Sequence, residues 1–229
     1  MKKLVIIPTY NEIENIQKLL PELLALPAEF DILVVDDSSP DGTAQYVQNF
    51  SQSQKRVHLL LRQKKNGLGQ AYIAGFKWGI EKGYEAVVEM DADFSHRPID
   101  LVSLLHGLEQ NEVVIGSRYV PGGTTVNWGI LRKIISRGGS LYSRLILGFP
   151  VMDWTGGFNG WHVQVLKDIG LDQIQSNGYS FQIELKYKAQ KKGHQVKELP
   201  IVFEDRRVGQ SKMSLKIVLE AFYKVWLIR

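Results

Sequence analysis

The chain has 229 residues, of which 44% are hydrophobic and 23% are charged, so it is long enough and apolar enough to fold around a core. It contains no cysteine, which excludes disulfides, thiolate zinc sites and a cysteine nucleophile, and which fits a reducing compartment. The formal net charge of +4 suits an anionic partner, namely a nucleic acid, a nucleotide or a membrane surface, and does not choose among them.

The first half of the chain alternates short apolar runs with amphipathic segments. The apolar runs are rich in β-branched residues, are bounded by turn formers and are predicted to be strands: 4–7, 32–35, 57–61, 86–90 and 113–116. A helix is predicted after a capping box at Asn11 and Glu14, and two more at 68–83 and 98–108. Strands and helices alternating at this interval predict an α/β fold, with a mostly parallel sheet covered by helices on both faces.

The second half of the chain is less regular. Glycine pairs at 122–123, 138–139 and 156–157 interrupt it, and a strand is predicted at 196–203. The last segment, 214–229, has apolar residues at helical spacing, with lysine or glutamate every four residues on another face. This pattern fits an interfacial helix on a membrane as well as a core-packed helix, and the periodicity favours the packed helix. Because no repeat or linker divides the chain, residues 1–229 are predicted to form a single domain.

Two aspartates follow the fourth predicted strand. Asp91 and Asp93 are two positions apart, so in an extended segment their side chains project to the same side. Carboxylates that close repel each other unless a proton or a cation lies between them, and oxygen ligands of this kind suit Mg²⁺ or Mn²⁺. Ligands bind parallel sheets beyond the carboxyl ends of the strands, which is where this pair lies. A solvated turn with helix-capping aspartates is the alternative interpretation.

Two further polar segments follow the first two predicted strands. They are 8–12, Pro-Thr-Tyr-Asn-Glu, and 36–42, Asp-Asp-Ser-Ser-Pro-Asp-Gly. Turn formation alone accounts for the composition of the second segment. However, an adjacent aspartate pair at the end of a buried strand is costly without a ligand or a cation. A carboxylate there can accept hydrogen bonds from a nucleotide base or from ribose hydroxyls.

Several motifs occur in a fixed order along the chain. They are 8–12, 36–42, 66–69 (Asn-Gly-Leu-Gly), 91–96 (Asp-Ala-Asp-Phe-Ser-His), 116–119 (Gly-Ser-Arg-Tyr), 132–138, 153–158 and 205–212. This succession resembles the inverting GT-A glycosyltransferases of family 2, and within them the dolichol-phosphate mannosyltransferase branch, from Val5 to about Lys212. The resemblance implies a nucleotide-diphospho-sugar transferase fold. It also implies an enzyme that moves mannose from GDP-mannose to the phosphate of dolichol or another polyprenol.

The resemblance further implies which residues bind the nucleotide sugar. The expected donor-binding residues come from the strand ends and from later loops: Pro8, Tyr10, Glu12, Asp37, Asp91, Ala92, Asp93, Arg118, Arg206 and Lys212. A divalent cation, Mg²⁺ or Mn²⁺, is expected at Asp91, Asp93 and Ser95, and many relatives carry glutamine at the position of Ser95. Asp91, Asp93 and Arg118 are the expected catalytic residues, with Arg118 beside the reacting phosphates.

The acceptor phosphate is expected, again from the resemblance, at Arg132, Ser136 and Arg137, although Arg137 also fits a solvated surface charge. A diphosphate leaving group and a phosphate nucleophile carry like charge, so several cations are needed around them. A lipid phosphate is already ionised near neutral pH and needs no general base, so in-line attack would give polyprenyl phosphate β-mannose. Asp153 is expected either to orient a substrate or to cap a turn.

The expected partners are GDP-mannose, a polyprenyl or dolichyl phosphate, a membrane surface and a membrane-anchoring subunit, with no nucleic acid. The first apolar run ends at Pro8 and is too short for a signal peptide, and no stretch reaches the roughly 18 apolar residues of a membrane-spanning helix. We therefore expect a cytoplasmic protein that associates peripherally with the cytoplasmic face of a membrane. The apolar and basic segment 133–147 is a second candidate, besides 214–229, for contact with lipid.

Three alternative functions stay open at this point. A UDP-glucose-dependent polyprenyl-phosphate glucosyltransferase would carry the same motifs, because they do not visibly distinguish guanine from uracil. A non-catalytic nucleotide- or nucleic-acid-binding module would not need Asp91 and Asp93, and its binding would weaken steeply with salt. A nucleotidyltransferase on a similar sheet would need a loop rich in glycine and lysine after the first strand, where 8–12 stands instead.

Overall fold

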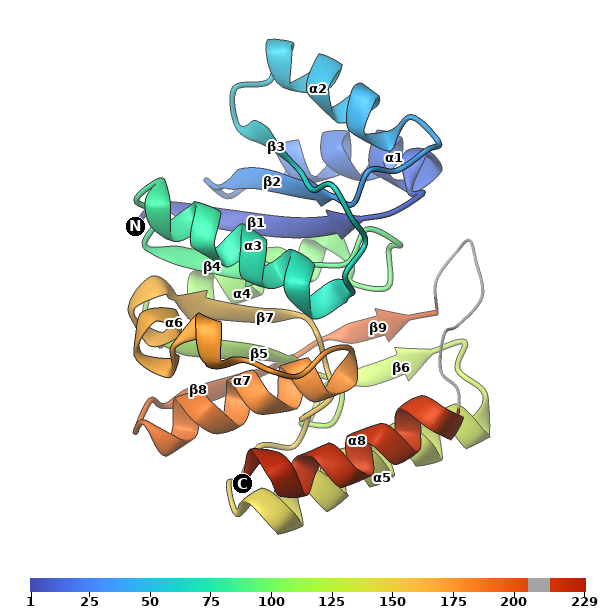
Figure 1. The fold of residues 1–229 in the computed structure, drawn as a ribbon, viewed down its shortest axis with the longest axis vertical. Coiled ribbons are helices and arrows are strands. Elements are labelled where there is room, and N and C mark those ends of the chain that lie inside the picture. The colour runs from blue at the N-terminus through green and yellow to red at the C-terminus, as the bar shows by residue number, and fades with distance from the viewer. Residues whose placement is uncertain (206–214) are drawn as a thin grey trace.

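A seven-stranded sheet runs through the protein in the order β3-β2-β1-β4-β7-β5-β8 (Figure 1). The computed structural model describes residues 1–205 and 215–229 of the chain. The strands of this sheet are β1 (Lys3–Thr9), β2 (Asp31–Asp36), β3 (Val57–Leu61), β4 (Ala86–Glu89), β5 (Val113–Ser117), β7 (Asn159–His162) and β8 (Val196–Pro200). Strand β7 is antiparallel to both of its neighbours, and the other pairs are parallel.

Helices cover both faces of the sheet, which is why its central strands are apolar without alternation. On one face, Leu4 and Ile6 of β1 pack in a core with residues of α3 (Leu68–Glu81), α6 (Val163–Ile169) and α7 (Tyr179–Lys191). On the other face, Val5 and Ile7 pack with α1 (Ile13–Leu24), α2 (Thr43–Ser53) and α4 (Pro98–Gly107). A short 3-10 helix, Leu171–Gln173, lies between α6 and α7. The expected α/β fold with a mostly parallel sheet is confirmed.

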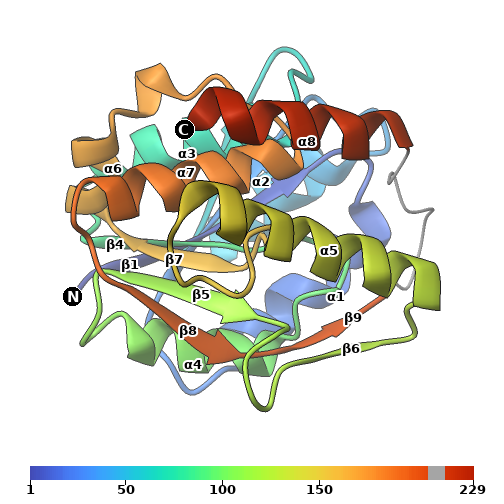
Figure 2. The same ribbon diagram turned by 90° about the horizontal axis from the view of Figure 1, so that it is seen from below.

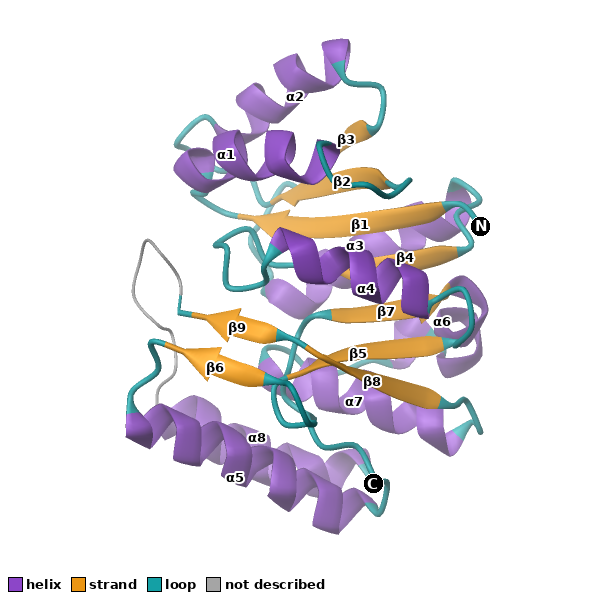
Figure 3. Ribbon diagram, turned by 180° about the vertical axis from the view of Figure 1, so that it is seen from behind, coloured by secondary structure: helices purple, strands orange, loops and turns teal. Residues whose placement is uncertain are grey.

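The predicted strand at 196–203 is two strands in the structure. β8 pairs with β5 in the large sheet, whereas β9 (Val202–Glu204) pairs with β6 (Thr124–Val126) in a separate two-stranded sheet (Figure 3). The change of partner follows Pro200, which has no backbone N–H to give to a continuing ladder. The single-strand prediction was therefore wrong at this point.

Two helices lie side by side at one end of the molecule, as both Figure 1 and Figure 2 show: α5 (Ile130–Leu147) and α8 (Leu215–Ile228). The rings of Tyr142 on α5 and Phe222 on α8 lie 4.2 Å apart, and the indole N–H of Trp226 donates to the Tyr142 hydroxyl at 2.7 Å. Val225 is buried in the core beneath them. Helix α8 therefore packs on the body of the protein. Within residues 1–205 and 215–229, no helix is both long enough and apolar enough to cross a bilayer.

Candidate active site

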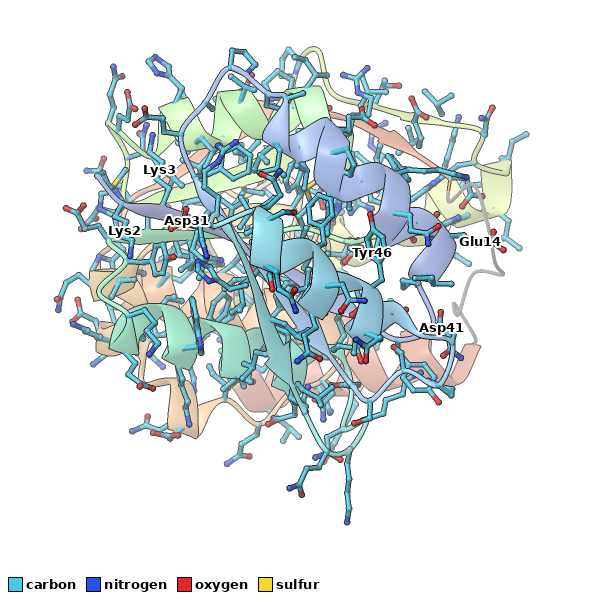
Figure 4. All side chains as sticks on the ribbon, turned by 90° about the horizontal axis from the view of Figure 1, so that it is seen from above. Lys2, Lys3, Glu14, Asp31, Asp41 and Tyr46 are labelled. Carbon is cyan, nitrogen blue, oxygen red and sulfur yellow. The ribbon has the colours of Figure 1, made fainter. Side chains whose placement is uncertain are left out.

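The candidate site lies where the parallel strands end. Lys3 and Asp31, which begin β1 and β2, lie at one end of the sheet, whereas Glu14 and Asp41 lie toward the opposite end (Figure 4). The loops that follow β1, β2, β4 and β5 all leave the sheet at this second, carboxyl end. Because β7 is antiparallel, the segment 153–158 that precedes it reaches the same edge. One edge thus collects five of the motif segments.

Asp36 and Asp37, which follow one another in the chain, have different partners. Asp36 accepts hydrogen bonds from the Thr9 hydroxyl at 2.7 Å and from the backbone N–H and hydroxyl of Ser39 at 2.8 and 2.7 Å. It therefore ties the ends of β1 and β2 together. Asp37 forms an ion pair of 2.9 Å with Arg62. Burial raises the pKa of Asp37, and the charge of Arg62 opposes that rise.

Two basic residues after β3 complete this part of the site, although the sequence had not singled them out. Arg62 directly follows β3 and pairs with Asp37, and the ammonium of Lys65 lies 3.6 Å from the centroid of the Tyr10 ring. Glu12 accepts a hydrogen bond of 2.7 Å from the side chain of Asn15. Only the order of strands in the sheet indicates that Arg62 belongs to the site, because β3 is paired with β2 and their carboxyl ends are adjacent.

The Asp-x-Asp segment is held in a tight turn after β4. The Phe94 backbone has a φ of 62°, which is uncommon for a residue with a side chain. Within the turn, the N–H of Ser95 donates to Asp93 at 3.0 Å, and the N–H of Asp91 donates to Nδ1 of His96 at 3.0 Å. Burial lowers the pKa of His96 to about 4, so the ring is neutral near pH 7 and its nitrogen can accept. The Tyr72 hydroxyl donates to Asp91 at 3.2 Å.

The oxygen atoms of this turn suit a divalent cation. Asp93 and Ser95 are buried, and the Ser95 hydroxyl has no hydrogen-bond partner among the described residues. No cluster of three or more acidic or histidine side chains suited to a metal occurs in the described ranges, 1–205 and 215–229. Mg²⁺ is commonly held by one or two carboxylates together with substrate phosphates and water. The two carboxylates and the hydroxyl therefore fit an ion that takes its other ligands from a diphosphate and water.

Arg118 is fixed by a buried carboxylate. Its Nε and Nη2 donate to the two oxygens of Asp153 at 2.7 and 2.6 Å, and its backbone N–H donates to the same carboxylate at 3.0 Å. A further bond of 2.9 Å joins Arg118 to the Thr155 hydroxyl. Burial acts to raise the pKa of Asp153, but the charge and hydrogen bonds of Arg118 outweigh it and hold the pKa below its ordinary value. Asp153 also accepts from the N–H of Gly156 at 2.9 Å, so it fixes the arginine and closes its own turn.

Beneath Arg118 lies a buried lysine. Lys186 on α7 is fully buried, and its ammonium donates to the backbone carbonyls of Asp153, Trp154 and Gly156 at 2.9, 3.3 and 2.8 Å. Burial lowers the pKa of Lys186 to about 8. These three bonds hold the segment that carries Asp153. The sequence had given no sign of this role, because Lys186 is followed closely in the chain by Lys188, Lys191 and Lys192 and nothing sets it apart from them.

A second buried group, Glu89, ends β4. It accepts hydrogen bonds from the Trp161 indole at 2.7 Å and from the Gln182 amide at 2.5 Å. Burial raises the pKa of Glu89 to about 7, and these hydrogen bonds oppose the rise. Because β4 continues directly into the Asp-x-Asp turn, the network links the turn to β7 and α7.

The predicted acceptor-binding residues lie at the start of α5. Arg132 pairs with Asp205 at 2.6 Å, and Ser136 accepts a hydrogen bond of 2.7 Å from the Tyr119 hydroxyl. Arg137 is exposed on the same helix. Arg132 also stacks on Trp128, with its guanidinium carbon 4.0 Å from the ring centroid, and the guanidinium carbon of Arg118 lies 5.4 Å from the same centroid.

Residues 4–170 match the family profile described as glycosyl transferase family 2. The chain belongs to this family. It is 48% identical over 225 residues, covering 98% of this chain and 93% of the relative, to the undecaprenyl-phosphate mannosyltransferase of Micrococcus luteus. It is 45% identical over 232 residues, covering 100% and 88%, to the polyprenol monophosphomannose synthase of Mycolicibacterium smegmatis. The dolichol-phosphate mannosyltransferase of Pyrococcus furiosus is 37% identical over 225 residues, covering 96% of this chain and 61% of that protein.

Solved structures of more distant proteins share the fold of this family 2 glycosyltransferase. The glucosyl-3-phosphoglycerate synthase of Mycobacterium tuberculosis, in complex with Mn²⁺, UDP and glucosyl-3-phosphoglycerate, has a TM-score of 0.67 at 15% identity over 99% of this chain and 78% of that chain. A mannosyltransferase from Pyrobaculum calidifontis, in complex with GDP-Man and Mn²⁺, has a TM-score of 0.64 at 17% identity over 99% and 64%. The expected family and GT-A fold are confirmed.

In this family 2 glycosyltransferase the structure brings most of the predicted site residues to one edge of the sheet. Those at or directly beyond the carboxyl ends of strands are Pro8, Tyr10, Glu12, Asp37, Asp91, Ala92, Asp93, Ser95 and Arg118. Arg132, Ser136 and Arg137 come from α5, and Arg132 reaches the strand-end residues through Trp128. Arg206 and Lys212 lie outside the described residues. The role of each residue in binding or catalysis stays a prediction.

Proposed function

We propose that this family 2 glycosyltransferase transfers mannose from GDP-mannose to the phosphate of a polyprenol, and that residues 1–229 act as a single catalytic domain. Relatives at 48% and 45% identity over nearly the full chain are named for mannosyl transfer involving polyprenols. The observation that carries the proposal is that the guanidinium groups of Arg118, from the end of β5, and Arg132, from α5, both lie against the ring of Trp128. Two anionic reactants need cationic groups on both sides.

On the donor side, Asp37 and Tyr10 would contact the nucleoside, and Asp91, Asp93 and Ser95 would hold Mg²⁺ or Mn²⁺. When bound, the ion neutralises charge on the departing nucleoside diphosphate. Arg118 contributes a second positive charge, and its pairing with Asp153 holds it in one orientation. A fixed charge need not reorganise during the reaction, which lowers the barrier.

On the acceptor side, Arg132, Ser136 and Arg137 would bind the lipid phosphate. Its oxygen is already ionised and attacks the anomeric carbon directly, so no side chain of the protein has to remove a proton. Attack opposite the leaving diphosphate inverts the configuration and gives polyprenyl phosphate β-mannose. The bond to the phosphate oxygen forms as the bond to the diphosphate breaks, and GDP leaves with the electron pair.

An exposed apolar surface on α5 and α8 supports peripheral contact with a membrane, and we propose that this contact is at the cytoplasmic face. Its side chains are Ile130, Leu131, Ile134, Leu141, Leu145, Phe222, Tyr223, Trp226 and Leu227, with exposed fractions between 41% for Phe222 and 78% for Ile130. The exposed Lys133 and Arg137 lie on the same helix, so the surface pairs apolar area with positive charge, as anionic lipid requires. Tyrosine and tryptophan favour the interface between lipid and water.

Arg132 lies on α5, the helix that carries part of this apolar surface, where it can reach a phosphate in the membrane plane. A membrane-anchoring subunit could use this surface too.

Product analysis tests the proposed function. The purified protein is given radiolabelled GDP-mannose or UDP-glucose, together with a short polyprenyl phosphate, with and without Mn²⁺. We expect label in the lipid fraction from GDP-mannose and only with metal, and a β linkage by NMR. The Asp93→Ala variant should lose transfer, whereas Asp172→Ala, at an exposed aspartate paired with Lys77, should keep it. Transfer from UDP-glucose alone would contradict the proposal, as would full activity of Asp93→Ala.

A further inference from the structure

The ring of Trp128 contacts both of the arginines to which the proposed function assigns the reacting phosphates. Its side chain is 8% exposed. The guanidinium carbons of Arg132 and Arg118 lie 4.0 and 5.4 Å from its ring centroid, and the Phe203 ring packs edge-on at 5.3 Å. Arginine is attracted to the face of an indole ring, more strongly where water is excluded. The ring therefore helps to hold both guanidinium groups in place.

Two buried N–H groups in this cluster lack a hydrogen-bond partner in the part of the chain that the structure describes. They are the indole Nε1 of Trp128 and the guanidinium Nε of Arg132, whose Nη1 is bonded to Asp205 at 2.6 Å. An unpaired buried donor has given up its hydrogen bond to water without replacing it, so native proteins seldom keep one without a ligand or an ordered water. Trp154 also buries an unpartnered indole N–H, but that ring is fully enclosed in the hydrophobic core. Trp128 differs because its neighbours are cations.

We propose that the indole N–H of Trp128 and the Nε–H of Arg132 bind an oxygen of a substrate phosphate, which makes Trp128 a further binding residue of the site. This role rests on the proposed function, in which two substrate groups carry phosphate oxygens. They are the diphosphate of the nucleotide sugar and the monophosphate of the lipid. Positively charged donors form short, strong bonds to phosphate oxygens, and a neutral indole donor adds direction without adding charge. Arg132 is the nearer arginine, so the lipid monophosphate is the expected source.

Binding measurements that require no turnover test this role. Trp128→Phe keeps an aromatic ring for the two arginines and removes only the N–H, whereas Trp128→Leu removes both. Trp78→Phe is the matched control, because Trp78 packs against His58 and Tyr84, away from the site. Titration calorimetry follows two probes separately, farnesyl phosphate and GDP with Mn²⁺. We expect Trp128→Phe to weaken the binding of one of the two probes about tenfold, which is the effect of losing one hydrogen bond to a charged group. The control variant should bind both probes with wild-type affinity.

A measurement on the unsubstituted protein keeps the test independent of folding in the variants. The chain has five tryptophans, so indole ¹⁵N labelling gives few signals, and that of Trp128 is assigned by elimination with single variants. A downfield shift of this signal on adding farnesyl phosphate identifies the lipid phosphate as the ligand, and a shift on adding GDP identifies the diphosphate. An unmoved signal with both probes, or wild-type affinity for both in Trp128→Phe, overturns the role of Trp128.

The same data separate this role from the proposed function. If the wild-type protein binds a probe through Trp128 but transfers no mannose, the proposed function fails and the role of Trp128 stands. If Trp128→Phe keeps wild-type affinities in a protein that transfers mannose, the role of Trp128 fails alone. Trp128→Leu should also lower kcat, because it removes the ring that the guanidinium groups of Arg118 and Arg132 both contact.

Discussion

Replacing Lys186 with methionine tests whether a buried ammonium holds the segment that positions Arg118. Lys186 is fully buried and donates to three carbonyl oxygens, of which the closest belong to Gly156 at 2.8 Å and Asp153 at 2.9 Å. Methionine is unbranched and flexible enough to fill a similar space, but it offers no donor. The variant therefore removes the hydrogen bonds and the charge while it keeps most of the packing.

The expected loss of stability follows from what the substitution leaves behind. Removing one partner from a buried charged network costs about 3–5 kcal/mol, but here the carboxylate of Asp153 keeps its pairing with Arg118 and the desolvated ammonium is gone. We therefore expect the free energy of unfolding to fall by about 2–4 kcal/mol, mainly from the carbonyls left without a donor. For a chain of 229 residues, each kcal/mol lowers Tm by about 2–4 °C.

The same lysine predicts a pH dependence. Burial lowers the pKa of Lys186 from its ordinary 10.5 to about 8 in the folded protein. Between these values the unfolded chain binds the proton and the folded chain does not, so the free energy of unfolding rises with pH across this window. The wild-type protein should therefore gain stability relative to Lys186→Met between pH 8 and pH 10.5, by about 3 kcal/mol at most, and the difference should be constant below pH 8.

Urea unfolding at pH 7 and pH 9.5, together with mannosyl-transfer kinetics, measures both effects. Lys188→Met is the matched control, because Lys188 lies on the same helix, is partly exposed and pairs with Glu184. We expect kcat to fall about tenfold in Lys186→Met and to be unchanged in the control, because a shift of Asp153 misplaces Arg118. If the two variants share one free energy of unfolding and one pH dependence, the ammonium does not hold the 153–156 segment.

Three further substitutions test other parts of the site. Asp153→Asn keeps the shape but removes the charge that faces Arg118, so kcat should fall at least tenfold; an unchanged kcat would show that the pairing does not matter. Ser95→Ala removes a buried hydroxyl, and we expect the Mn²⁺ concentration for half-maximal activity to rise a few-fold without a loss of Tm. An unchanged Mn²⁺ requirement would exclude Ser95 as a ligand. Leu145→Glu on α5 should abolish flotation with phosphatidylglycerol vesicles, whereas Ile99→Glu on α4 should not; equal flotation would place the lipid contact elsewhere.

The sequence was sufficient to predict the strands of the first half and the edge of the sheet where the site lies. The run at 32–35 is apolar without alternation because helices cover both faces of β2, and such a run is recognisable without knowing its neighbours. The rule that ligands bind beyond the carboxyl ends of parallel strands then placed Asp37, Asp91 and Asp93 together. Both steps depend only on local patterns and on chain order.

Features that depend on distant partners were not predictable. A capping box was expected at Asn11, but Asn11 has a φ of 60°, and it is Asp41, after β2, that accepts the Ile13 N–H at 3.0 Å. Strand β7, Asn-Gly-Trp-His, lacks the β-branched pattern of its neighbours, because Gly160 faces Leu108 and Asn159 joins a polar network. A Cβ on Gly160 would lie 2.8 Å from the Leu108 side chain, so close packing and not strand propensity selects glycine there.

The antiparallel insertion of β7 explains why charged groups lie under this site. Because β7 runs against β4 and β5, the segment before it turns at the carboxyl edge, and its backbone carbonyls need donors that no neighbouring strand can supply. Lys186 supplies those donors, and Asp153, on the same segment, reaches Arg118. Buried charges are costly unless they are paired, so a sheet optimised for stability alone would favour apolar residues at these positions. Their use here gives Arg118 one fixed orientation, which a flexible surface arginine would lack, beside the proposed path of the transferred sugar.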